Sequence, residues 1–164
     1  KRSLLRGTER AIQIGAIFVI WILMIIGVLV FVAVPFVAGL LVDEYDEYAN
    51  EFWPIVVMLV TPTLLAESLL VIILVLLRRI RVDQMFSIAA HKWVGALSYN
   101  AAALSATFLV ILVWLSFKNT LPPIIGLTLL IGCFLPLAVS LVTRALLVLL
   151  KNATAKSEEL EGVV

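Results

Sequence analysis

The sequence predicts an all-α integral membrane protein, with four transmembrane helices in one bundle and both chain ends in the cytoplasm. Composition, four long apolar segments and the distribution of charge each indicate this fold. Of the 164 residues, 63% are hydrophobic and 14% are charged, whereas soluble domains average about 45–50% apolar and about 25% charged residues. A chain of this length cannot bury so much apolar surface in one aqueous core, so we expect lipid to be its solvent.

Four apolar segments are long enough to cross a hydrocarbon core of about 30 Å, which takes about 20 helical residues. We expect spans at residues 11–35, 53–77, 93–117 and 121–150, in one domain covering residues 1–164. A short polar tail, residues 151–164, then lies in the cytoplasm, and we expect it to extend the last span as a helix.

The first apolar run continues from Ala11 to Val42, past Pro35. This run is far longer than the apolar region of a signal peptide, about 7–15 residues, so we expect a retained span. Proline removes a backbone hydrogen bond and clashes with the preceding turn, so we expect a kink or break at Pro35. Residues 36–42 would then lie at or beyond the outer membrane interface.

Basic residues are concentrated on one side of the expected spans. That side carries Lys1, Arg2, Arg6, Arg10, Arg78, Arg79, Arg81, Lys92, Lys151 and Lys156, and the other side carries only Lys118. The positive-inside rule therefore predicts that both chain ends face the cytoplasm. The first connection becomes an extracellular acidic loop, with Asp43, Glu44, Asp46, Glu47 and Glu51.

The chain lacks the common signatures of metal, nucleotide and redox chemistry. It has one cysteine, one histidine, and neither GxGxxG nor GxxxxGK[ST]. No CxxC pair or intrachain disulfide is possible with one cysteine, and one histidine disfavours a zinc or haem site within a chain. We therefore expect no metal, no cofactor and no enzymatic activity.

A carboxylate, Glu67, lies inside the apolar stretch TPTLLAESLLVIILVLLRR. At about 1.5 Å per residue it is about 16 Å from Arg78, close to mid-membrane. A charge at that depth costs at least about 2.5–3.5 kcal/mol, so we expect Glu67 to be protonated, paired or next to a wet cavity. Pro62 predicts a bend nearby, where Thr61 and Thr63 offer hydroxyls to freed backbone groups.

A second intramembrane charge, Arg144, comes seven residues before Lys151, about 10 Å inside the cytoplasmic boundary. Its stem can bridge the depth difference of about 6 Å to Glu67, so a Glu67–Arg144 pair is one hypothesis. Helix–helix adhesion, a ligand- or proton-responsive site and a transport site stay open as its role. The expected buried polar layer comprises Glu67, Tyr99, Asn100, Ser140, Thr143 and Arg144.

The cytoplasmic connection RRIRVDQMFSIAAHKW combines basic and apolar side chains. Its two interpretations are an anchor to anionic lipid headgroups and a docking surface for a cytosolic protein. Direct nucleic-acid binding is not expected, because the same basic residues face lipid phosphates. The residues concerned are Arg78, Arg79, Arg81, Met85, Phe86 and Lys92.

The third span carries small residues at spacings that place them on one helix face, which allows another helix to approach closely. The partner is either a helix of the same bundle or a second copy of the chain in a homodimer. The face comprises Gly95, Ser98, Ala102, Ser105 and Ala106.

The segment LLRRIRVDQMFSIAAHKWVGAL, followed by two more spans and the tail SEELEGVV, resembles bacterial membrane proteins grouped as domain of unknown function 2975. The resemblance extends over most of the chain and implies a four-helix bacterial inner-membrane protein. It also implies a small helix-turn-helix regulator encoded nearby as a possible cytosolic partner, an association rather than a physical argument. It supplies no catalytic residue.

The leading hypothesis is a non-enzymatic sensory or regulatory membrane protein whose Arg78–Lys92 connection and tail hold such a regulator. One alternative is an immunity or resistance protein, whose acidic loop at residues 43–51 binds a cationic antimicrobial peptide. The other is a small proton-coupled carrier that uses Glu67. Dual-topology carriers need little charge bias, so the strong bias of this chain disfavours that arrangement.

Overall fold

The computed structural model describes residues 2–80, 88–119, 121 and 123–162, and this part of the chain is helical apart from short connections. Four of its helices are long and apolar enough to cross a membrane, as the sequence predicts. The chain divides into two compact units, Lys1–Leu77 and Arg78–Val164, and each is described by itself. The arrangement of all four helices in one bundle stays a prediction.

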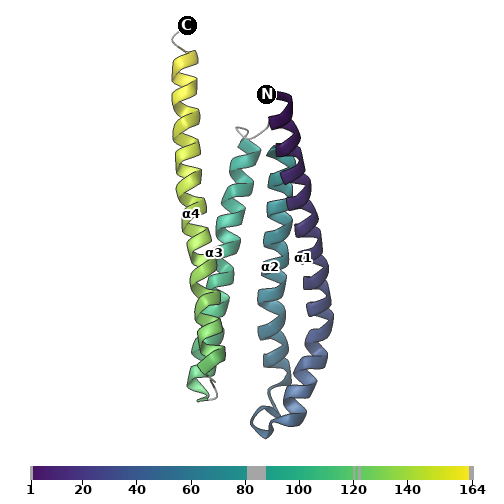
Figure 1. Cartoon of the computed structure of the whole chain (residues 1–164). Helices are drawn as coiled ribbons and strands as arrows, with labels where there is room; N and C mark the ends of the chain where they lie inside the picture. The colour runs from purple at the N-terminus through teal and green to yellow at the C-terminus, as the bar shows by residue number, and fades with distance from the viewer. Residues whose placement is uncertain (1, 81–87, 120, 122, 163–164) are drawn as a thin grey trace. The chain divides into compact units, whose positions relative to one another are not determined.

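The first unit is a helical hairpin made by α1 (Arg2–Glu44) and α2 (Phe52–Ile80). The two helices run antiparallel, and the short 3-10 helix η1 (Asp46–Tyr48) lies in the connection between them (Figure 1). The connection is held by its own backbone: the Tyr48 amide donates to the Tyr45 carbonyl at 2.9 Å. The rings of Tyr45 and Tyr48 also meet edge to face, with centroids 6.3 Å apart.

Helix α1 passes through Pro35 and ends nine residues later at Glu44. Of the kink or break expected at Pro35, the break is therefore wrong, and residues 36–42 continue the helix. Prolines are tolerated within apolar membrane helices because neighbouring groups and small local adjustments satisfy the freed carbonyl. The stretch Arg10–Glu44 is about 50 Å long at 1.5 Å per residue, which exceeds the hydrocarbon thickness of a bilayer.

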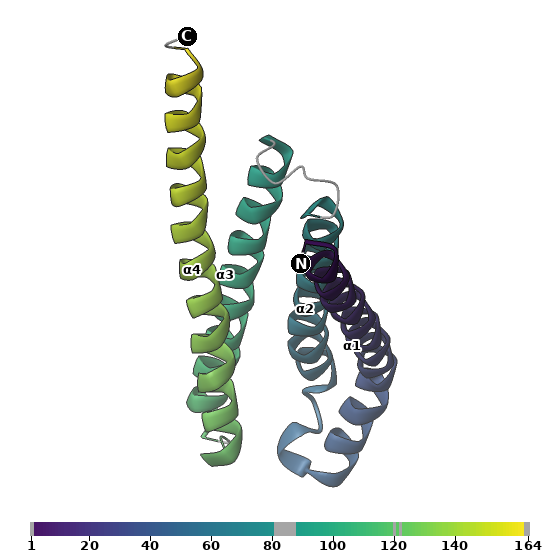
Figure 2. The ribbon, with the colours of Figure 1, turned by 45° about the horizontal axis from the view of Figure 1, so that its top comes forward.

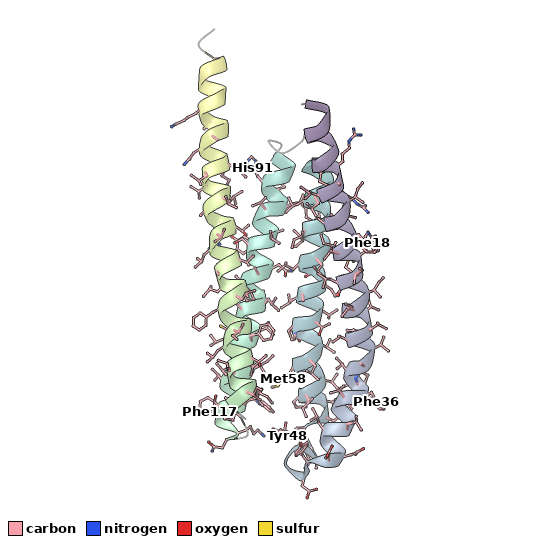
Figure 3. All side chains as sticks on the ribbon, in the orientation of Figure 1. Phe18, Phe36, Tyr48, Met58, His91 and Phe117 are labelled. Carbon is pink, nitrogen blue, oxygen red and sulfur yellow. The ribbon has the colours of Figure 1, made fainter. Side chains whose placement is uncertain are left out.

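One face of α1 is shielded from solvent and follows a seven-residue spacing. Ile20, Val34 and Ala38 are buried, and Gly27, midway between Ile20 and Val34, is half-buried. Steps of seven and four residues keep one stripe of a helix against a neighbour at a shallow crossing angle. Phe18 projects from α1 outside this stripe and is exposed (Figure 3).

Helix α2 likewise continues through its internal proline, Pro62. The hydroxyls of the flanking threonines bond to carbonyls one turn earlier on the same helix: Thr61 Oγ1 donates to Val57 O at 2.8 Å, and Thr63 Oγ1 donates to Leu59 O at 2.7 Å. Each hydroxyl is thus satisfied within α2, as is common for such residues in apolar surroundings.

The second unit is a hairpin of α3 (Ile88–Phe117) and α4 (Pro123–Glu161), which run antiparallel side by side (Figure 2). Asn119 ends α3 with a positive φ of 53°, a left-handed conformation that asparagine tolerates better than most residues. The Lys118 amide donates to the Trp114 carbonyl at 3.2 Å, and its ammonium lies 5.3 Å from the Trp114 ring. Proline begins α4, where its missing N–H costs nothing.

The α3–α4 interface is built on small residues. Its backbones approach more extensively than those of any other described pair of elements. On α3, Ser98, Ala101 and Ser105 are buried at steps of three and four. On α4 the buried positions alternate steps of three and four, the pattern of a left-handed two-helix seam; they are Gly126, Leu129, Cys133, Pro136, Ser140 and Thr143.

Helix α4 continues beyond its apolar part. The apolar stretch ends at Ala153, and the helix ends at Glu161. Figure 1 shows this end of α4 reaching past the first turn of α3. The expectation that the tail extends the last span as a helix is confirmed, and we call residues 151–161 the α4 extension.

Most apolar side chains of the four helices face outward. Within the most apolar stretch of each helix, only 11% to 17% of the residues are buried. An aqueous protein could not expose so many leucine, valine and isoleucine side chains, whereas a hydrocarbon solvent favours them. The side chains on the α1 and α4 surfaces in Figure 3 illustrate this exposure.

Candidate functional site

A polar cluster joins α3 and α4 near the first turns of α3, and Ser98 is its centre. Ser140 Oγ donates to the Ser98 carbonyl at 2.9 Å, and Ser98 Oγ donates to the Ser140 carbonyl at 3.1 Å. The two hydroxyl oxygens lie 3.1 Å apart. Ser98 is only 2% exposed, so the bonds that satisfy it are sheltered from competition and fix the register of the two helices.

Arg144 completes this cluster from α4. Its Nε donates to Ser98 Oγ at 3.0 Å, and its guanidinium carbon lies 5.2 Å from the centre of the Tyr99 ring. That separation is within the range of a cation–π contact. Ser140 precedes Arg144 by one helical turn, so the α4 seam that buries Ser140 also sets the position of Arg144 at its edge. Arg144 and Tyr99 are both exposed.

A second serine repeats this arrangement one heptad away. Ser105 Oγ donates to the Cys133 carbonyl at 2.7 Å and lies 3.6 Å from Cys133 Sγ. Ser98 with Ser140 and Ser105 with Cys133 lie in the same antiparallel register, seven residues apart on both helices. Cys133 is a free cysteine buried in this seam, where its Sγ contacts Ser105.

The first unit holds Glu67 against α1 at Gly27. A Cβ added at Gly27 would overlap Glu67 Oε1 and would lie 2.6 Å from the carboxyl carbon. The missing side chain of Gly27 therefore leaves the space that the Glu67 carboxyl fills. Glu67 is half-buried there, and within the described part of the first unit it makes no ion pair.

The structure brings together part of the expected polar layer. Tyr99, Ser140 and Arg144 meet at Ser98, while Thr143 Oγ1 bonds to Val139 O of its own helix at 2.6 Å. Asn100 is half-buried beside the cluster on α3. Glu67 belongs to the first unit and Arg144 to the second, so the Glu67–Arg144 pair stays a prediction.

Sequence reasoning did not assign two of the residues that build these sites. Ser98 was expected only on a small-residue face, and Gly27 was not considered. The signal for Ser98 is its place in a 3-4 spacing that matches the spacing on α4, where small residues recur at Gly126, Cys133 and Ser140. For Gly27, the signal is the seven-residue spacing to Ile20 and Val34.

The expected small-residue face of the third span lies partly against α4. Ser98 and Ser105 are buried there, together with Ala101, which the prediction did not include. Gly95 and Ala102 are half-buried, and Ala106 is exposed. A partner within the same hairpin is thus found for Ser98 and Ser105. The expected homodimer face, Gly95, Ser98, Ala102 and Ala106, stays a prediction.

The expected cytoplasmic contact residues are described only in part. Arg78 at the end of α2 and Lys92 near the start of α3 are exposed. His91, beside Lys92 (Figure 3), has an Nε2 atom without a hydrogen-bond partner in the described part of the chain. The remaining side chains of this set lie outside the described residues: Arg79, Arg81, Met85 and Phe86.

The expected acidic loop lies at the α1–α2 connection. Asp43, Glu44 and Asp46 are exposed, and Glu51 is half-buried. The Glu47 side chain lies outside the described residues. Within the described part of the chain, no group of three or more His, Cys, Asp or Glu side chains is placed to hold a metal ion.

Comparison with known proteins relates the chain to one family. The profile of the family described as "protein of unknown function (DUF2975)" matches residues 36–164. The chain belongs to this family. The matched region begins just after Pro35 and includes α2, α3 and α4, with all of the α3–α4 cluster and Glu67. No match was found among curated proteins or among solved structures.

Proposed function

We propose that this chain is a non-enzymatic, multi-pass protein of the bacterial inner membrane that holds a cytosolic regulatory protein. Both chain ends lie in the cytoplasm, as the bias of basic residues indicates. The regulator binds the α4 extension and the basic connection between α2 and α3. The family resemblance makes a small helix-turn-helix regulator the first partner to test.

The observation that carries this proposal is the continuation of α4 beyond its apolar stretch. A helix that served only to cross the membrane would need about 20 residues, whereas α4 runs from Pro123 to Glu161. An isolated helix of about 11 polar residues is marginal in water. The α4 extension is stabilised because it continues the long apolar part of α4. It also presents exposed charged side chains, including Lys151 and Lys156.

The basic connection between α2 and α3 supplies a second contact in this proposal. Arg78 and Lys92 are exposed at the two ends of the α2–α3 connection. Basic side chains at a membrane surface attract acidic surfaces over about a Debye length, which is about 8 Å at physiological ionic strength. A regulator held there is kept near the membrane until a signal in the membrane or outside releases it.

Co-purification tests the proposal. The full chain, solubilised in mild detergent, is captured together with the regulator encoded beside it. We expect retention by the unmodified chain, and loss after deletion of residues 154–164 or after combined reversal of Arg78, Arg79 and Arg81 to glutamate. The matched control, Asp46→Lys in the acidic loop, keeps the regulator. Equal retention by all variants, or by none including the unmodified chain, contradicts the proposal.

A proton-coupled carrier is a second candidate, favoured by the place of Glu67 against Gly27. A carboxyl inserted between two apolar helices can exchange a proton as the helices separate. Proton flux through liposomes that contain the full chain tests this function. The carrier hypothesis predicts that Glu67→Gln abolishes flux while Glu44→Gln, on the exposed connection, leaves it unchanged. Undiminished flux in Glu67→Gln removes Glu67 from any coupling role.

A further inference from the structure

We infer that Arg144 and Tyr99 form a binding site for the phosphate of an anionic glycerophospholipid such as phosphatidylglycerol. The site goes beyond regulator binding, although it rests on the proposed membrane embedding of α4. Its elements are a guanidinium held in place from one side, an exposed aromatic ring and an apolar track that leads away from both.

The guanidinium is preorganised. An arginine has five N–H donors in a planar fork, and Arg144 uses its Nε–H on Ser98 Oγ at 3.0 Å. Ser98 is itself fixed by its bonds to Ser140. Within the described part of the chain, the terminal nitrogens of Arg144 have no further hydrogen bond or ion pair. They present a pair of parallel donors, the arrangement that binds phosphate in a bidentate manner.

Tyr99 covers one face of the guanidinium. Its ring lies beneath the Arg144 carbon at 5.2 Å and is itself 71% exposed. A guanidinium held over an aromatic ring loses part of its freedom to swing. The Tyr99 hydroxyl makes no hydrogen bond within the described residues. Tyrosine with an apolar ring and a polar tip is typical of the depth where headgroups meet hydrocarbon.

The depth of the site favours a lipid over a soluble anion. Arg144 lies seven residues before Lys151, about 10 Å along the helix from this first lysine after the apolar residues of α4. An arginine at this depth draws phosphate and water inward, because local thinning of the bilayer costs less than an unpaired charge in hydrocarbon. A phosphate tethered to acyl chains reaches this position without leaving the membrane.

An apolar track for an acyl chain begins directly beside the guanidinium. Leu141, Leu137 and Phe134 precede Arg144 at steps of three, four and three, so all four side chains share one face of α4. All three apolar side chains are exposed, Leu141 at 60% and Phe134 at 64%. They lead from Arg144 toward the middle of the apolar stretch, the direction in which the acyl chain of a headgroup-bound lipid extends.

Native mass spectrometry of the full chain in nonionic detergent tests this site. The probes are phosphatidylglycerol, phosphatidylcholine and inorganic phosphate, each added separately. We expect one phosphatidylglycerol to bind more tightly than the other two probes. Loss of a bidentate charge-assisted contact in Arg144→Gln should weaken it by about tenfold or more. Arg10→Gln, which removes an exposed arginine of α1 outside the site, is the matched control and keeps the affinity.

Two further variants keep the test decisive if Arg144→Gln does not fold. Ser98→Ala retains the charge and removes only the anchor of Nε, so we expect a several-fold weaker phosphatidylglycerol affinity with an unchanged phosphatidylcholine affinity. Glu67→Gln tests whether Arg144 pairs with the Glu67 carboxylate instead of with a lipid phosphate. It should leave phosphatidylglycerol binding intact. Equal affinity in Ser98→Ala or Arg144→Gln, equal binding of inorganic phosphate, or loss of binding in Glu67→Gln each overturns the site.

These outcomes are distinct from those that bear on the proposed function. A chain that binds phosphatidylglycerol through Arg144 but does not retain the regulator keeps the lipid site and loses the regulatory proposal. A chain that retains the regulator equally with and without phosphatidylglycerol binding loses only the lipid site.

Discussion

Both helical hairpins of this protein are strongly apolar, but their helices are held together by different chemistry. In the α3–α4 hairpin, hydroxyls of Ser98, Ser105 and Ser140 reach the backbone of the opposite helix. In the α1–α2 hairpin, the defining contact is between Gly27 and the Glu67 carboxyl. Serine hydroxyls stay neutral at any physiological pH, whereas a carboxyl can gain or lose a charge.

Because of this difference, we expect the two hairpins to respond differently to substitution. Neutral hydrogen bonds and small residues fix the α3–α4 register, and a fixed register keeps Arg144 and the α4 extension in place. In the α1–α2 hairpin, the end of a flexible side chain, the Glu67 carboxyl, fills the space at Gly27 and can move aside. We therefore call the α3–α4 hairpin, with its hydrogen-bonded register, the rigid hairpin, and the α1–α2 hairpin the adjustable hairpin.

The largest expected effect comes from enlarging the buried alanine of the rigid hairpin. Ala101 is fully buried at the α3–α4 seam, so Ala101→Leu must force the helices apart and should cost about 3 kcal/mol, the upper range for overpacking. Unfolding of the full chain by SDS in mixed micelles measures this. Ala106→Leu, on the exposed side of the same helix, is the control. If both variants unfold alike, the small-residue seam does not hold this hairpin together.

A smaller effect is expected in the adjustable hairpin. Gly27→Ala places a methyl group where Glu67 lies, and the flexible carboxyl can move aside, so the expected loss is about 1 kcal/mol. Gly39→Ala, which has open space around it on the same helix, is the control. The loss should shrink in the Glu67→Ala background, because the overlapping group is gone. Additive effects of the two substitutions would show that Gly27 and Glu67 do not interact.

The smallest effect belongs to a single serine of the seam. Ser140→Ala removes one interhelical bond, to the Ser98 carbonyl, and should cost about 0.6 kcal/mol. Ser116→Ala serves for comparison, because that hydroxyl bonds only to Leu112 O of its own helix. The same SDS titration measures both. A loss for Ser116→Ala as large as that for Ser140→Ala would remove the interhelical bond from the explanation.

Helix number and approximate position followed from the sequence because length and apolarity decide them. The sequence predicted a span that ends at Pro35, because proline commonly breaks helices in aqueous proteins. Within apolar membrane helices, neighbouring groups and small local adjustments satisfy the freed carbonyl, so the helix can continue. It also placed Glu67, Tyr99, Asn100, Ser140, Thr143 and Arg144 in one layer on depth alone. Depth along a helix is readable from residue numbers, whereas the face that each residue presents to a neighbour depends on which helices pair.

The pairing of helices explains the remaining differences. Ser98 and Ser140 become partners only in the antiparallel register of α3 and α4, and nothing local to either segment specifies that register. The absence of a side chain at Gly27 matters only because α2 lies against α1 and places the Glu67 carboxyl in that space. Only the two helices compared together carry a signal for the first of these pairs, because the seven-residue spacing from Ser98 to Ser105 matches that from Cys133 to Ser140.

The orientation of the chain in the membrane is the claim on which the proposed function depends, and cysteine labelling tests it directly. In a Cys133→Ala background, which removes the single native cysteine, one variant carries Asp46→Cys and another carries Lys156→Cys. The account predicts that a membrane-impermeant maleimide labels position 46 in intact cells and labels position 156 only after permeabilisation. Labelling of position 156 in intact cells, with position 46 protected, would contradict it.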